Sequence, residues 1–88
     1  MTDRPFVKIC VIGLGYVGLP TAAVFASRGV HVLGVDTNAD AVDLINRGKI
    51  HIIEPGLDTM VHEAVMKGLL TAEAKPEAAD AHIIAVPT

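Results

Sequence analysis

Three glycines between a run of aliphatic residues and an alanine-rich stretch limit the possible fold of this chain more than any other feature. Residues 13–18 read Gly-Leu-Gly-Tyr-Val-Gly. Lys8–Ile12 before them is short and aliphatic, which predicts a buried strand that ends in a tight turn. Residues 16–28 place small and apolar side chains on one helical face, and Pro20 lies in the first turns, where a missing amide donor costs little. The sequence therefore predicts a strand, a glycine turn and a helix in direct succession.

The rest of the chain continues this alternation. Gly29 and Gly48 are the expected left-handed ends of the first two helices, and Thr37 or Asn38 is the expected cap at the start of the second. We expect strands at 31–35, 69–74 and 82–86, helices at 37–46 and 57–67, and a helical turn at 76–80. Strands and helices at this spacing predict an α/β fold, in which right-handed crossovers give a parallel sheet in the order 3-2-1-4 with flanking helices.

The glycine pattern matches G-x-G-x-x-G, which is weak evidence alone but stronger between a strand and a helix. Gly13 permits the tight turn, Gly15 lets the backbone approach a pyrophosphate, and Gly18 lets the helix pack close to the strand. The free amides and positive dipole end of the helix then face the phosphates. Asp36 ends the next strand, where the pattern places a carboxylate that binds the adenosine ribose. We therefore predict a partial Rossmann fold with a dinucleotide site, and favour it over a glycine turn without a ligand and an aspartate that only caps a helix.

The residues around Asp36 also select the cofactor. A carboxylate repels the 2′-phosphate of NADP, and NADP sites place an arginine nearby. Thr37 and Asn38 follow Asp36, and the next residues include no arginine. NAD is therefore favoured over NADP, whereas FAD enzymes share the glycine pattern and stay possible.

Composition argues against several other classes of protein. The net charge is -3 without a basic cluster, so nothing indicates binding to nucleic acid or to an anionic membrane. Residues 9–27 carry no charge and resemble a signal peptide or short membrane span, but three glycines and Pro20 interrupt them. His62 and His82 have no ligand-like partners at useful spacing, which argues against a metal site.

The single cysteine, Cys10, lies inside the first aliphatic run. One cysteine excludes an internal disulfide and fits a reducing compartment, so we expect a cytoplasmic location. A catalytic thiol needs an electropositive and reachable setting, which the core of a strand lacks. We therefore interpret Cys10 as a small buried hydrophobic residue.

The loop at 49–56 holds the remaining candidates for chemistry. Its expected anchors are three apolar residues, Ile50, Ile52 and Ile53. The spacing of His51 and Glu54 suggests a catalytic pair, but charged residues also form structural pairs. We favour the interpretation that Arg47 and Glu54 tie down the loop while His51 packs or faces solvent.

Over nearly its whole length the chain resembles the UDP-glucose/UDP-N-acetylmannosamine dehydrogenases. The matching segments follow one another in family order: 11–20, 34–36, 45–48, 54–57, 79–81 and 85–88. Residues 18–22 and 50–55 are similar to the UDP-N-acetylmannosamine branch. The UDP-glucose branch usually carries a basic residue where this chain has Ala41, and this departure puts one phosphate or ribose contact in doubt while it supports the first branch.

The resemblance implies two successive NAD-linked oxidations that turn the C6 alcohol of a UDP-sugar substrate into a carboxylate. It implies that the amides of Tyr16 and Val17 meet the pyrophosphate and that Asp36 meets the ribose. It places the region beside the second ribose at Val86, Pro87 and Thr88. The family's catalytic residues lie beyond residue 88, so we expect no catalytic residue here and interpret residues 1–88 as the amino-terminal part of an NAD-binding domain.

Other interpretations stay open at this point. The chain can be a stand-alone nucleotide-binding or sensing module, or belong to another Rossmann dehydrogenase, such as a hydroxyacyl or phosphogluconate type. Independently of these, the strand at 82–86 carries no charged side chain to protect an exposed sheet edge. We therefore expect this edge to pair with another copy and the chain to form a homo-oligomer.

Overall fold

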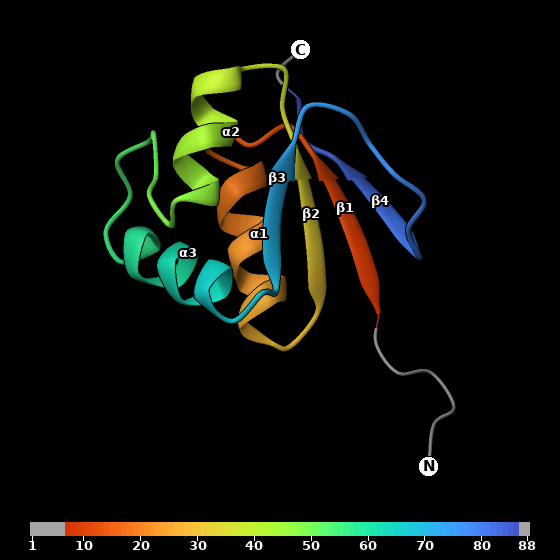
Figure 1. Cartoon of the computed structure of the whole chain (residues 1–88), viewed down its shortest axis with the longest axis horizontal. Coiled ribbons are helices and arrows are strands. Elements are labelled where there is room, and N and C mark those ends of the chain that lie inside the picture. The colour runs from red at the N-terminus through yellow and green to blue at the C-terminus, as the bar shows by residue number, and fades with distance from the viewer. Residues whose placement is uncertain (1–6, 87–88) are drawn as a thin grey trace.

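A computed structural model describes residues 7–86, which form a parallel sheet with helices on one face (Figure 1). In chain order the elements are β1 (Lys8–Ile12), α1 (Gly18–Ser27), β2 (His31–Val35), α2 (Ala39–Asn46), α3 (Leu57–Met66), β3 (Leu70–Glu73) and β4 (Ala81–Ile84). The strands lie in the order β3-β2-β1-β4, as predicted, and each neighbouring pair is parallel. Between residues 7 and 86 no helix is long and apolar enough to cross a membrane.

The helix-covered face of the sheet holds the main core. Alternate strand residues point into it, among them Val11 of β1 and Val32 of β2. The α1 helix meets these strands with small residues, Ala22, Ala23 and Ala26, so its backbone comes close to the sheet. Helix α3 then packs against α1 and buries Val61. This packing fixes the start of α1 against the carboxyl end of β1.

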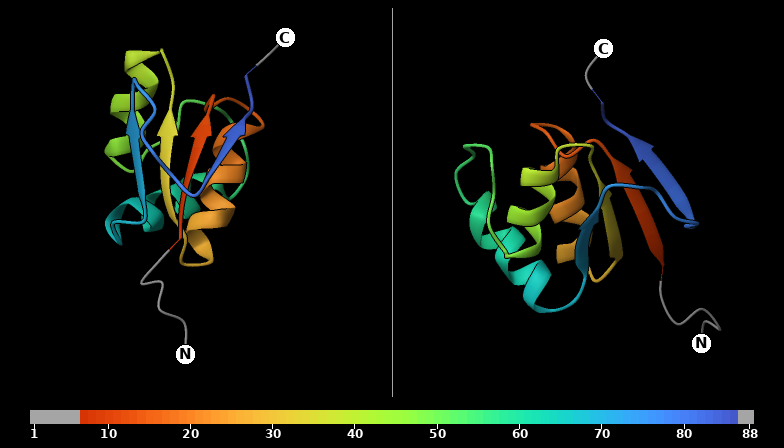
Figure 2. Two further views of the ribbon diagram at one scale, coloured as in Figure 1. Left: turned by 90° about the vertical axis from the view of Figure 1, so that its right-hand side faces the viewer. Right: turned by 45° about the horizontal axis from the view of Figure 1, so that its top comes forward.

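The opposite face is covered by the connection 74–80, which crosses it on the way from β3 to β4 (Figure 2). Cys10, Leu33 and Val35 are buried there, and Ala79 packs against them. The predicted helical turn at 76–80 is wrong, because this segment forms no helix. Its polar groups instead bond to the sheet.

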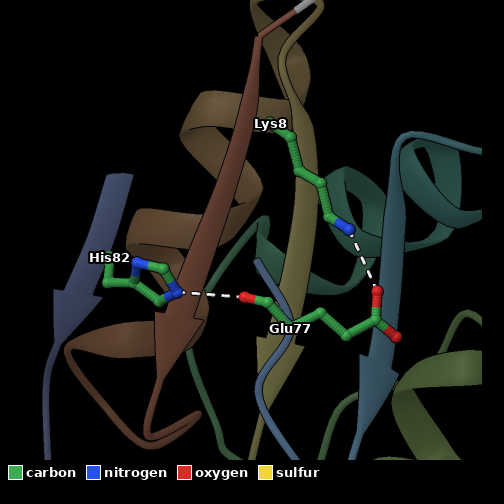
Figure 3. A network of polar contacts seen from close by, with 3 residues as sticks. All are labelled: Lys8, Glu77 and His82. Carbon is green, nitrogen blue, oxygen red and sulfur yellow. Dashed lines mark hydrogen bonds and ion pairs between the residues drawn. The ribbon is translucent and has the colours of Figure 1, made fainter. Parts of the chain in front are cut away.

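Lys8 at the start of β1 binds this connection through its side chain and its backbone. Its ammonium lies 3.0 Å from Glu77 Oε1 (Figure 3). Its backbone amide donates to Asp80 Oδ2, and its carbonyl oxygen accepts from the amide of Asp80. His82 Nε2 lies 3.0 Å from the carbonyl oxygen of Glu77. The hydrogen bonds from Lys8 and Glu73 hold the pKa of Glu77 below its ordinary value, whereas the hydrogen bond to Glu77 and its negative charge raise the pKa of Glu73. The connection 74–80 therefore depends on exposed, charge-assisted contacts.

Other differences from the expected elements are local. Helix α1 starts at Gly18 because residues 16–17 form a turn, and the last strand ends at Ile84. Asn38, not Thr37, caps α2: its side chain accepts hydrogen bonds from the amides of Asp40 and Ala41. Ile52 is buried as expected, but Ile53 is 90% exposed, so the expectation that it anchors the loop is wrong.

Candidate functional site

The glycine turn lies at the carboxyl ends of β1 and β2, beside the start of α1. The connections through α1 and α2 run over one face of the sheet, whereas the connection 74–80 runs over the other (Figure 2). The direction of winding therefore reverses at β1. In open α/β sheets, ligands bind outside the carboxyl ends of the strands at such a reversal.

Two glycines of the pattern are fixed by close backbone packing. Gly13 has a φ of +99°, and a Cβ there would lie 2.9 Å from the carbonyl carbon and oxygen of Ala85. A Cβ on Gly18 would overlap the carbonyl oxygen of Gly13. At these two positions the protein's own backbone excludes a side chain, whether or not a ligand is bound.

Gly15 differs, because a Cβ there would meet no atom within 4 Å and its φ is not positive. Its neighbours Tyr16 and Val17 are 66% and 68% exposed. Among the residues that the structure describes, the amides of Gly15, Tyr16 and Val17 have no hydrogen-bond acceptor. Val17 caps α1 without a side-chain hydrogen bond, and the first turn has no acidic residue. This helix start can therefore accept an anion.

Asp36 stands at the other side of the turn. Its Oδ2 accepts a hydrogen bond of 2.9 Å from the amide of Leu14, and its Oδ1 accepts one of 2.8 Å from the amide of Asn38. Partial burial acts to raise the pKa of Asp36, but these backbone hydrogen bonds and the positive charge of His51 outweigh it and hold the pKa below its ordinary value. The carboxylate is therefore ionised near neutral pH and keeps lone pairs for further donors.

A groove of about 440 Å³ joins these features. Its lining includes Gly13, Gly15 and Asp36, together with Val86 across the turn. The structure thus brings together Gly15, Asp36 and Val86 at one groove, while Gly13 and Gly18 support it from within. Pro87 and Thr88 lie outside the described residues.

The candidates for chemistry in the loop at 49–56 lie outside this groove. The side chain of Arg47 pairs with Asp43 one turn earlier in α2, at 3.1 Å, so the prediction that it ties down the loop is wrong. His51 and Glu54 are both exposed, and the lining of the groove includes neither. His51 acts on the site through its charge, which helps to lower the pKa of Asp36.

Leu14 also borders the groove, although the sequence pattern did not single it out. It has no exposed surface, its amide bonds to Asp36, and its side chain lies over Gly34 of β2. A glycine inside a predicted buried strand was the available signal, because it marks a close approach of other atoms.

Comparison with known proteins agrees with this geometry. Residues 7–88 match the model of the UDP-glucose/GDP-mannose dehydrogenase family, NAD binding domain. The UDP-N-acetyl-D-mannosamine dehydrogenase of Campylobacter jejuni is 66% identical over 83 residues, which are 94% of this chain and 20% of that protein.

Two solved structures have the same fold over most of this chain. The UDP-N-acetyl-mannosamine dehydrogenase of Staphylococcus aureus superposes with a TM-score of 0.88 at 50% identity, over 91% of this chain and 19% of that one. The GDP-mannose dehydrogenase of Pseudomonas aeruginosa, solved as a ternary complex, gives 0.88 at 37% identity over the same shares. The chain thus spans about a fifth of the length of the relatives it matches. It belongs to the UDP-glucose/GDP-mannose dehydrogenase family, as part of the family's NAD-binding domain.

Proposed function

We propose that the chain holds NAD for a nucleotide-sugar dehydrogenase that oxidises the C6 alcohol of UDP-N-acetylmannosamine to the carboxylate. One observation carries the proposal: the open space at Gly15 and the ionised carboxylate of Asp36 share a single groove. The similarity to UDP-N-acetyl-D-mannosamine dehydrogenases supports this substrate.

Each part of the groove suits one part of the cofactor. The pyrophosphate fits at Gly15, where the amides of Tyr16 and Val17 are free and the dipole of α1 favours an anion. Asp36 accepts hydrogen bonds from the adenosine ribose hydroxyls. Val86 borders the groove, and the family resemblance assigns the second ribose to residues 86–88, of which 87 and 88 lie outside the described residues. Bound NAD supplies the hydride acceptor, and these residues orient it.

This chain supplies no catalytic group in our proposal. Cys10 has no exposed surface and lies on the face that the connection 74–80 covers, so its thiol cannot reach a substrate. Hydride transfer also needs an aligned substrate and an acid-base or nucleophilic group. Those groups are expected in the part of the relatives that this chain does not span.

The choice of cofactor tests the binding site directly. Calorimetric titration of the 88-residue chain is expected to show tighter binding of NAD than of NADP, because Asp36 repels the 2′-phosphate. Asp36→Asn removes that charge but keeps a side-chain oxygen for the amide of Leu14, so it is a better test than Asp36→Ala and is expected to narrow the preference. Equal affinities in the unmodified chain would exclude this role of Asp36.

A chimera tests the reaction and the substrate. The chain replaces the matching residues of the Campylobacter jejuni relative, and NADH formation is followed with UDP-N-acetylmannosamine and UDP-glucose. We expect the chimera to be active and to prefer UDP-N-acetylmannosamine, and the isolated chain to form no NADH. An inactive, folded chimera that still binds NAD would favour a nucleotide-binding or sensing module instead.

We also propose that copies of the chain associate through β4. This strand lies at an edge of the sheet, and Ile84 is 70% exposed. Exposed apolar edges favour pairing with another chain. Sedimentation at increasing concentration is expected to show dimers or larger species, and Ile84→Lys is expected to weaken them. A monomer at every concentration would contradict this part of the proposal.

A further inference from the structure

We propose that Leu14 and Gly34 form a size-matched pair that positions the carboxylate of Asp36, and so sets how well the chain distinguishes NAD from NADP. This inference rests on the proposed NAD site and adds two positioning residues to it. Neither residue has to contact the cofactor for the pair to act.

The first step is the fit between the two residues. Leu14 has no exposed surface, although it lies in the turn that borders the groove. Gly34 is buried in β2, and a Cβ there would lie 2.8 Å from Leu14 Cδ1 and 2.9 Å from Cδ2. The side chain of Leu14 therefore occupies the space that any other residue at position 34 would need.

The second step connects this fit to Asp36. The amide of Leu14 donates to Asp36 Oδ2 at 2.9 Å, while the side chain of Leu14 lies over Gly34, two residues before Asp36. The amide of Gly13 donates to the carbonyl oxygen of Val35 at 2.7 Å, which joins the same two segments. Leu14 therefore contacts both ends of the tripeptide that carries the carboxylate. A shift of Leu14 moves its amide relative to Oδ2.

The third step compares two substitutions that change the packed volume in opposite directions. Gly34→Ala pushes Leu14 away from β2, whereas Leu14→Val makes room beside Gly34. Because residues in contact give non-additive effects, the double variant is expected to recover what Gly34→Ala loses. Two unrelated structural defects would instead add.

The experiment measures the ratio of NAD to NADP affinity by calorimetry in the 88-residue chain. We expect Gly34→Ala to lower this ratio about tenfold, the effect of losing the geometry of one charge-assisted hydrogen bond. Leu14→Val is expected to lower it less, and the double variant to recover most of the loss. Val61→Ala in α3 is the control, because it removes buried volume from a helix that supplies no hydrogen-bond partner to Asp36, and it is expected to leave the ratio unchanged.

Several outcomes would contradict the proposed role of Leu14 and Gly34. An unchanged ratio in folded Gly34→Ala, a double variant no better than Gly34→Ala, or an equal fall in Val61→Ala would each do so. If Gly34→Ala does not fold, Leu14→Ala decides, because it must lower the ratio if the pair acts through Asp36. Absence of NAD preference in the unmodified chain would instead contradict the proposed role of Asp36, so the two failures are distinguishable.

Discussion

The glycine turn at 13–18 joins β1 to α1, and the connection at 74–80 joins β3 to β4, but different forces hold the two segments. In the turn, backbone atoms of Gly13, Gly18 and Ala85 pack so closely that a single Cβ cannot be added. The connection is held by an ion pair that water can reach: the side chain of Lys8 is 33% exposed and that of Glu77 is 50% exposed. The turn is therefore sensitive to volume, and the connection to charge and salt.

This difference supports the proposal that the groove at the turn is the NAD site. A site that recognises a pyrophosphate and a ribose needs donors and acceptors held in place before the ligand arrives. Close backbone packing supplies that rigidity without using any polar group that the ligand requires. Exposed ion pairs contribute little rigidity, because water and salt compete with them.

The largest effect is expected for Gly18→Ala. Its Cβ would overlap the carbonyl oxygen of Gly13, so α1 has to move away from β1. Overpacking costs about 1–3 kcal/mol, and this contact with backbone puts the loss at about 3 kcal/mol or more. Urea denaturation measures it. Gly15→Ala is the matched control in the same motif and is expected to stay within about 0.5 kcal/mol of the unmodified chain. Equal losses of stability in both variants would contradict the distinction between Gly18, where a Cβ overlaps the backbone, and Gly15, where it does not.

A smaller effect is expected from acid. The folded structure holds the pKa of Asp36 below its ordinary value, because hydrogen bonds to its ionised form and the charge of His51 outweigh partial burial. The ionised carboxylate therefore stabilises the fold above about pH 4, and this contribution is lost as the pH falls through the lowered pKa. Denaturation curves between pH 6 and pH 2.5 measure it. Asp36→Asn is expected to lose less stability on acidification than the unmodified chain, and identical pH dependence would contradict the account.

The smallest effect on overall stability is expected at the connection 74–80. Lys8→Met removes the ion pair to Glu77 but keeps the aliphatic stem and the backbone bonds to Asp80. We expect faster amide hydrogen exchange in 74–80, with the glycine turn unchanged and the melting temperature nearly so. Raising the salt concentration is expected to shrink the difference. Arg47→Met breaks another surface ion pair, with Asp43, and should leave exchange in 74–80 unaltered. Equal exchange in Lys8→Met and the unmodified chain would mean that the backbone bonds alone hold the connection.

The same contrast separates what the sequence could predict from what it could not. The strands, their order and the glycine turn were predictable, because aliphatic runs and glycines at fixed spacing have few structural solutions. The predicted helical turn at 76–80 is wrong: the segment forms no helix, and it contacts Lys8, which is distant in sequence. The bond between Leu14 and Asp36 also depends on tertiary structure, so a local pattern did not reveal it.

The most direct test of the central claim is the affinity of Gly15→Val for NAD. In the proposed site the space at Gly15 is kept open for the pyrophosphate, since a Cβ there would have no atom within 4 Å other than those of Gly15 and its two neighbours in the chain. Valine is therefore expected to leave the circular dichroism spectrum and the urea midpoint nearly unchanged, while NAD binding falls below detection by calorimetry. The affinity of Gly15→Ala for NAD is expected to lie between those of the unmodified chain and Gly15→Val. A folded Gly15→Val variant that binds NAD as tightly as the unmodified chain would contradict the account, because the phosphates would then have to lie elsewhere.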